Sequence, residues 1–112
     1  MAQKRWINTK IWDDSFVFEL DPIEKLVWIY LLTNSATNIA GVYEISPRRI
    51  AVDTGLDSDT VKKILDRFEE AGKVKHEKGW LAMRNWIKHQ SKSPKIRAGI
   101  EDILRTVPEW CL

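Results

Sequence analysis

The fold is decided by residues 46–86, which read SPRRIAVDTGLDSDTVKKILDRFEEAGKVKHEKGWLAMRNW. Ser46-Pro47 predicts a helix start, because serine is a favoured N-cap and proline suits the first turn. Gly55 is placed to end that helix as a left-handed cap. Asp57 or Ser58 caps a second helix, whose apolar residues at 61, 64, 65 and 68 recur at helical spacing. The segment 46–71 therefore predicts a helix-turn-helix.

A β-hairpin is predicted directly after this motif. Residues 73–77 and 80–86 are strand candidates, and Lys78-Gly79 between them suits a tight turn. A helix-turn-helix followed by a hairpin is the winged-helix order. The expected fold class is mainly α with a small β-hairpin: a winged helix-turn-helix plus a C-terminal helix.

Working outward, Asp21-Pro22 starts a helix that runs to about Thr33, with Glu24 placed for a capping box. This helix is apolar almost all round, so it must be covered on more than one face. Residues 41–45 form a short strand candidate. A third Ser-Pro pair at 93–94 starts an amphipathic helix that ends near residue 108. We expect a winged-helix domain with an N-terminal extension over 1–92, and a helix over 93–112 that either packs on it or leads to a further C-terminal region.

The chain has 112 residues, 44% of them hydrophobic, which suits one core and one domain. Cys111 is the only cysteine, so no internal disulfide forms and a reducing compartment is expected. The longest apolar run, 26–32, is far too short to span a bilayer. These features predict a cytoplasmic protein with no membrane partner.

Sequence motifs of catalysis are missing. The chain has no glycine-rich phosphate loop, no serine or cysteine nucleophile signature and no paired-carboxylate motif. His76 and His89 have no second ligand at metal spacing, and one cysteine cannot complete a zinc site. We therefore expect no enzymatic activity, no cofactor and no metal site.

The net charge of +2 is too small to indicate nucleic acid, but the charges are unevenly distributed. The stretch 84–100 holds five basic residues and no acid, which makes it a candidate electrostatic footprint. Lysines on the hairpin and arginines at the start of the first motif helix add to it. The alternative is an ordinary solvated basic surface. The candidate DNA-contacting residues are Arg48, Arg49, Thr60, Lys63, Lys73, Lys75, Lys78, Lys88, Lys92, Lys95 and Arg97.

The second motif helix is a poor match for duplex DNA. Its outward face carries Asp59, Lys63, Asp66 and Glu70, and the three acids repel phosphate. We therefore favour a solvated or protein-facing role for this helix over major-groove reading. Affinity is expected to come from phosphate contacts made by the wing and the segment after it.

Six tryptophans supply much apolar area for a chain of this length. Core packing is the favoured use, and an oligomer interface is the alternative. The candidate interface residues are Trp6, Trp12, Trp28 and Leu32. Trp80 and Trp86 share one face of the second hairpin strand, so packing and the stacking of single-stranded bases both remain open for them.

Several short segments in order resemble the N-terminal domain of phage replication initiators. They are Leu31-Leu32-Thr33-Asn34, then TNIAGVYEI at 37–45, Gly79-Trp80, RNWIKHQ at 84–90 and SPKIRAGI at 93–100. These proteins are also called replisome organisers, are related to the DnaD-like primosome proteins, and match over roughly residues 6–108. The resemblance implies a winged helix, origin or single-strand DNA contact, and self-association. Family members usually carry a further C-terminal region that contacts DNA and helicase-loading partners, so helicase loading is not expected of residues 1–112 alone.

The expected function is that of a DNA-binding and self-associating domain of a phage-type replication initiator, in the cytoplasm of a bacterial host. Its expected partners are DNA, further copies of the chain, and host helicase-loading or primosome proteins. A winged-helix transcriptional regulator is one alternative, but it needs a less acidic recognition helix. A replisome protein-interaction module is the other, and it would bind no DNA even at low salt.

Overall fold

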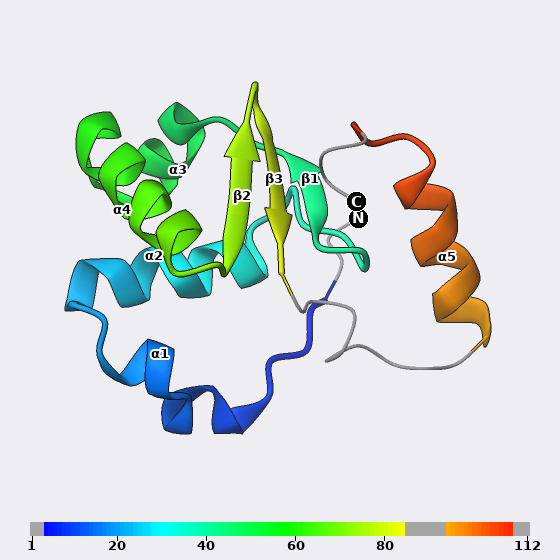
Figure 1. Cartoon of the computed structure of the whole chain (residues 1–112), viewed down its shortest axis with the longest axis horizontal. Helices are drawn as coiled ribbons and strands as arrows, with labels where there is room; N and C mark the ends of the chain where they lie inside the picture. The colour runs from blue at the N-terminus through cyan, green and yellow to red at the C-terminus, as the bar shows by residue number, and fades with distance from the viewer. Residues whose placement is uncertain (1–3, 85–93, 109–112) are drawn as a thin grey trace.

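The computed structural model describes residues 4–84 and 94–108 of the chain, without the side chains of 94–96. In chain order its elements are the 3-10 helix η1 (Thr9–Asp13), α1 (Ser15–Phe18), α2 (Pro22–Thr33), β1 (Val42–Glu44), α3 (Pro47–Thr54), α4 (Ser58–Glu70), β2 (Val74–Glu77), β3 (Trp80–Met83) and α5 (Pro94–Leu104). Figure 1 shows α2, α3 and α4 gathered on one side of a small sheet. The mainly helical winged helix-turn-helix predicted from the sequence is confirmed, with β1 as a third strand.

The ends of the helices follow the predicted caps. The Glu24 carboxylate accepts a hydrogen bond from the Asp21 N–H at 2.8 Å at the start of α2. Ser46 Oγ accepts from the Arg49 N–H at 3.1 Å, and Gly55 ends α3 with φ of +80°. Asp57 caps α4 by accepting from the Thr60 N–H at 2.8 Å. Helices α2, α3 and α4 therefore begin where a side chain satisfies a free backbone N–H group.

The sheet is antiparallel in the order β1-β3-β2. The β2–β3 turn is made by Lys78 and Gly79 with φ of +50° and +84°, as a two-residue hairpin turn of the primed type requires. Ile45 N–H donates to Gly79 O at 2.8 Å, which ties the tip of the wing to the segment before α3. The prediction that the second strand extends to Trp86 is wrong, because β3 ends at Met83, opposite the first residue of β2. Trp86 itself lies outside the described residues.

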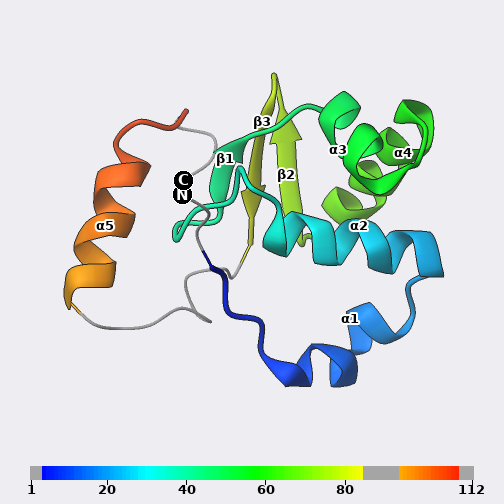
Figure 2. The ribbon, with the colours of Figure 1, turned by 180° about the vertical axis from the view of Figure 1, so that it is seen from behind.

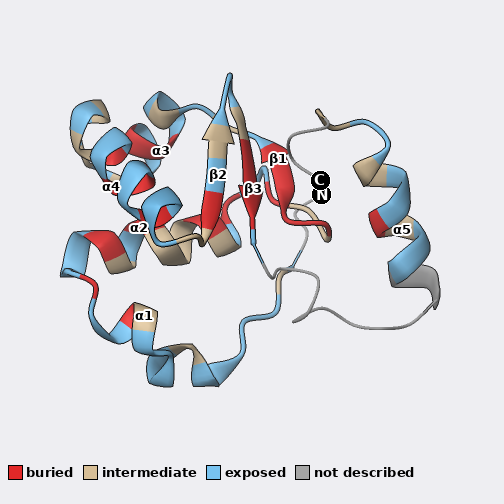
Figure 3. Ribbon diagram, in the orientation of Figure 1, coloured by how far each residue is buried: buried red, intermediate tan, exposed pale blue. Residues whose placement is uncertain are grey.

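The core lies between the inner face of the sheet and helices α2, α3 and α4 (Figure 3). Its centre includes Phe68, whose ring meets those of Phe16 and Trp28 edge-on, with centroids 5.6 and 5.3 Å away. Phe16 belongs to α1, so the N-terminal extension covers one side of α2. Ile23 and Leu26 of α2 remain 44% and 45% exposed, so the predicted cover of this helix is incomplete within the chain.

Helix α5 lies on the other side of β1 from α3 and α4, as Figures 1 and 2 both show. Ile100 of α5 is buried. Gly99 lies so close to the segment before β1 that an added Cβ would be 2.8 Å from Ile39 Cδ1. Among the described residues, no helix is long and apolar enough to cross a membrane.

One ion pair links α2 to α4 at the edge of the core. The buried Glu24 carboxylate accepts from Arg67 Nη1 at 2.7 and 2.6 Å, and the guanidinium covers it from solvent. Glu24 also caps α2, so one carboxylate orders both the start of α2 and its contact with α4. A buried acceptor of this kind is costly when it loses its donor.

We expect Arg67→Ala to lower the free energy of unfolding by about 1–3 kcal/mol, because Glu24 is left buried with only its own helix cap. Arg105→Ala is the matched control, since Arg105 pairs with Asp102 on an exposed helix face. That change should cost less than about 1 kcal/mol. Urea unfolding followed by circular dichroism measures both, and equal losses would contradict the role given to Arg67.

Candidate nucleic-acid interface

A groove of about 310 Å³ runs between α4 and the wing, the hairpin of β2 and β3. Its lining includes Pro47 at the start of α3, Lys62 of α4, and Lys78 and Trp80 of the hairpin. We call it the wing groove. Lys62 and Lys78 are both exposed, so each side of the groove offers one lysine. The carboxylates of Asp66 and Glu77 line the same groove, so its formal charges balance overall.

The positions of these two lysines follow from the local structure. The buried stripe of α4 turns Lys62 outward, and Leu65 and Asp66, one turn further along, line the same groove. Lys78 sits at the tip of the wing because the turn places it there. Arg48, next to Pro47, is exposed at the same end of the molecule. Lys62 was missed as a contact residue, since the sequence shows its charge but not that it faces the wing.

The exposed charges of α4 divide along its length. The acidic residues Asp66, Glu69 and Glu70 lie in the second half, and Asp59 in the first. Asp66 is hydrogen-bonded to His76 of β2 at 3.0 Å, so this part of the helix faces β2. Arg67 is held by Glu24. The first half carries two lysines, Lys62 and Lys63, and one acid, Asp59. It therefore repels phosphate less than the helix as a whole.

Two of the predicted contact residues are held by neighbours within the chain. Thr60 Oγ1 donates to Asp57 Oδ2 at 2.9 Å. Arg49 Nε donates to Asp53 Oδ2 at 2.8 Å, and the Tyr30 hydroxyl donates to the same oxygen at 2.6 Å. The hydrogen bonds from Tyr30 and Arg49 hold the pKa of Asp53 below its usual range. The pKa of Tyr30 is raised, mainly because its hydroxyl is partly buried and secondly because it is hydrogen-bonded to Asp53. Asp53 therefore joins α3 to α2 through Tyr30, and it largely matches the charge of Arg49.

The predicted basic residues of the wing do not form one cluster. Lys73 lies at the base of the wing, with Nζ 5.2 Å from the centre of the Phe16 ring, which suits a cation–π contact. Lys75 is exposed on the outer face of the sheet, opposite Ala82. Only Lys78 lines the wing groove.

The basic segment after the wing is described only in part. Lys88 and Lys92 lie outside the described residues, and Lys95 belongs to α5 but its side chain is not described. Arg97 is exposed on α5, on the far side of β1 from α4. Arg84 donates to Gly72 O at 3.4 Å at the base of the wing. None of these side chains is described at the wing groove.

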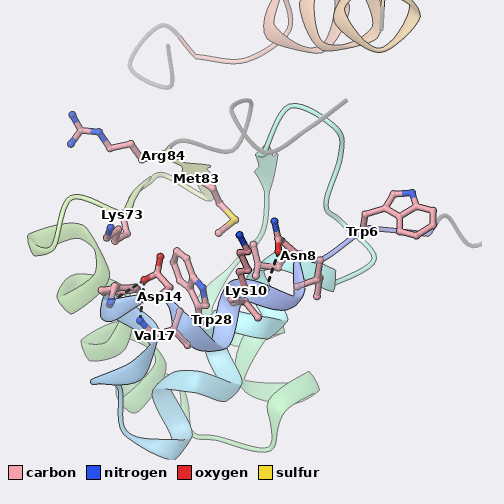
Figure 4. Close-up of a pocket in the computed structure, with 13 residues that line it drawn as sticks. Trp6, Asn8, Lys10, Asp14, Val17, Trp28, Lys73, Met83 and Arg84 are labelled. Atoms are coloured by element: carbon pink, nitrogen blue, oxygen red, sulfur yellow. Dashed lines mark hydrogen bonds between the residues drawn. The ribbon is translucent and has the colours of Figure 1, made fainter. Parts of the chain in front are cut away.

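A second pocket of about 380 Å³ lies between the N-terminal extension, α2 and the base of the wing (Figure 4). Trp28 and Leu32, two of the predicted interface residues, line it and are partly buried against the core. Lys73 and Arg84 lie on its wing side, and Asp14 on the other side caps α1 through the Phe16 N–H at 2.9 Å. The pocket therefore joins apolar side chains to basic ones.

The other two predicted interface residues face solvent. Trp6 is 94% exposed and Trp12 60%. Four further apolar side chains of residues 7–26 are also exposed and were not predicted as interface residues: Ile7, Phe18, Ile23 and Leu26. The continuous apolar pattern of α2 indicated surplus apolar surface, but only the structure shows which side chains remain uncovered.

The expectation that His76 has no second candidate ligand is wrong. Asp66, Glu69 and His76 bring donor atoms to within 4.8 Å of one another. The spacing of the two carboxylates on α4 was visible in the sequence, but the position of β2 against that helix was not.

Comparison with protein-family models, with curated proteins and with solved structures returned no match to the chain. The resemblance to phage replication initiators therefore rests on the quoted residues alone.

Asp57 gives the start of α4 a defined pH dependence. Hydrogen bonds from the N–H and the hydroxyl of Thr60 lower the pKa of Asp57 in the folded chain. A lowered pKa contributes stability that is present above the unfolded value of about 3.9 and is lost as the pH falls through the folded value.

We expect Asp57→Asn, which keeps an oxygen acceptor at the cap, to remove this pH-dependent part. The difference in free energy of unfolding between wild type and variant should be largest near neutral pH and shrink below about pH 4. Urea unfolding between pH 3 and 7 measures it. Glu44→Gln, on an exposed strand position, is the charge-matched control, and a constant difference for Asp57→Asn would contradict the prediction.

Proposed function

We propose that the chain is a DNA-binding and self-associating domain of a phage-type replication initiator, acting in the cytoplasm of a bacterial host. The observation that carries the proposal is the wing groove, which is lined by Lys62 of α4 and by Lys78 at the tip of the wing, with Arg48 exposed beside its lining residue Pro47. A fold hosts many functions, so this charge arrangement and the family resemblance support the proposal, and the fold alone does not.

The groove suits phosphate contacts better than base reading. In a DNA-reading helix the N-terminal residues approach the base edges. In α4 these are Ser58 and Thr60, both partly buried, and Asp59, which repels phosphate. Thr60 already donates its hydroxyl to Asp57. We therefore propose sequence-tolerant binding driven by release of counterions, which disfavours a transcriptional regulator.

Lysines on both sides of the groove also distinguish this function from a pure protein-interaction module, which needs no phosphate-binding charge. No catalytic role is proposed. Host helicase-loading or primosome proteins are the protein partners that the resemblance suggests for the full initiator.

The double variant Lys62→Gln, Lys78→Asn tests the groove. Asparagine tolerates the positive φ at position 78, so the hairpin turn is kept. Loss of two phosphate contacts should make the slope of log affinity against log salt shallower by about 1.8 on duplex DNA, at about 0.9 per contact. Fluorescence anisotropy with several unrelated duplexes at rising salt measures affinity, slope and sequence preference together.

The control is Lys25→Gln, Arg105→Gln, which removes the same charge from α2 and from the end of α5. It should leave the slope close to that of wild type. An unchanged slope in the groove variant, or a tight and salt-insensitive preference for one duplex, would place the DNA contact elsewhere. No binding by wild type at low salt would favour the protein-interaction module.

Self-association is proposed through the N-terminal extension and the first turns of α2. Trp12, Phe18, Ile23 and Leu26 keep 44–75% of their surface exposed there. Exposed apolar side chains on this scale are typical of interaction sites in soluble proteins. The same surface lies away from the wing groove, so DNA and a second copy need not compete.

We expect wild type to form dimers or larger oligomers at high micromolar concentration, and Trp12→Gln, Phe18→Gln to shift it toward monomer. Burial of these rings supplies the association free energy, at about 25 cal/mol per Å² of apolar surface. Val52→Gln is the control, because Val52 is 71% exposed on α3 outside this region. Sedimentation velocity distinguishes the species, and a monomeric wild type would refute the interface.

A further inference from the structure

Three metal-ligating side chains meet where α4 faces β2. His76 Nε2 lies 3.0 Å from Asp66 Oδ1 and 3.7 Å from Glu69 Oε2. Asp66 and Glu69 are three residues apart on α4, which puts both carboxylates on one face of the helix. His76 comes from the neighbouring strand, so the cluster joins the second motif helix to the wing.

The carboxylate of Glu69 is oriented by the backbone. Its Oε1 accepts a hydrogen bond from the His76 N–H at 3.4 Å, and its Oε2 is the oxygen near the imidazole ring. The His76 side chain is 24% exposed, and Asp66 and Glu69 are 65% and 43% exposed. The donors are thus held on two elements and remain open to solvent on one side.

The charges of the cluster are not balanced within the described chain. Two carboxylates face one ring nitrogen, and a neutral imidazole donates a single N–H there, to one acceptor. The described residues place no lysine or arginine in an ion pair with Asp66 or Glu69. A cation among the three donors would neutralise both carboxylates at once.

We propose that Asp66, Glu69 and His76 bind a divalent zinc ion through Asp66 Oδ1, Glu69 Oε2 and His76 Nε2. Zinc accepts imidazole and carboxylate ligands at about 2.0–2.2 Å, which at tetrahedral angles puts the ligand atoms about 3.3–3.6 Å apart. The distances of 3.0 and 3.7 Å from the ring nitrogen lie on either side of this range. Three protein ligands leave a fourth position for water.

A route for the ion is present, because Asp66 and His76 also line the wing groove. Bound zinc would clamp α4 to β2 and cancel the negative charge of the second half of α4. Zinc binding at this site does not require DNA binding, so the zinc proposal and the proposed function are tested independently. Without zinc, the cluster is a hydrogen bond between His76 and Asp66 that links β2 to α4.

The test is calorimetric titration of the tag-free full chain with zinc, in a background with His89→Gln and Cys111→Ser. Those two changes remove the only other histidine and the only thiol of the chain. We expect one zinc ion per chain. His76→Gln, Asp66→Asn and Glu69→Gln should each weaken binding by more than the about 10- to 100-fold usual for loss of an outer-shell partner.

Asp59→Asn and Glu70→Gln are the matched controls, because each removes one exposed carboxylate from the same helix outside the cluster. They should leave zinc affinity unchanged. Thermal unfolding in chelator checks that every variant folds. If His76→Gln does not fold, the zinc affinities of the cluster variants Asp66→Asn and Glu69→Gln decide the outcome.

Zinc should also raise the melting temperature of the background protein but not of the Glu69→Gln variant. Unchanged zinc affinity in the folded cluster variants, or an equal loss in the controls, would overturn the site. No zinc binding at millimolar concentration would overturn it as well and leave the hydrogen bond between His76 and Asp66 as the role of the cluster.

Discussion

Burial of the apolar stripe of α4 is the interaction on which the rest of the structure depends. Val61, Ile64, Leu65 and Phe68 are all buried, and they meet the sheet, α2 and α3. This packing sets the rotation of the helix about its own axis. The rotation in turn decides that Lys62 faces the wing groove, that Arg67 reaches Glu24, and that Asp66 reaches His76. A change that reduced this stripe would therefore disturb core, charge pattern and candidate sites together.

The rotation of α4 also separates two kinds of surface on one helix. Its first half presents lysines beside the tip of the wing, where phosphate contacts are proposed. Its second half presents the Asp66 carboxylate to His76 of β2, and the Arg67 guanidinium to Glu24 of α2. In the second half of the helix, the acidic residue Asp66 holds a neighbouring strand, whereas in the first half Asp59 repels phosphate. The total charge of the helix therefore describes neither half.

The N-terminal extension both packs against the core and keeps apolar side chains exposed. Phe16 enters the core by packing on Phe68 and Trp28, so η1 and α1 are held against the winged helix. Val17 of α1 is buried as well, but Trp12 and Phe18 of the same two helices remain exposed. One segment therefore completes the core and leaves the apolar surface through which self-association is proposed.

The sequence by itself determined the helix starts, the glycine stop, the hairpin turn and the winged-helix order. These features depend on residues at most a few positions apart, such as the Asp57 cap and the Lys78-Gly79 turn, so local chemistry specifies them. The tertiary structure alone decided that Lys62 and Lys78 line one groove, that Tyr30 of α2 reaches Asp53 of α3, and that His76 lies close to Asp66 and Glu69. It also decided where β3 ends, because a strand lasts only as long as its partner. These outcomes depend on how α4 is rotated and where β2 lies against it, and both follow from burial of the whole core at once.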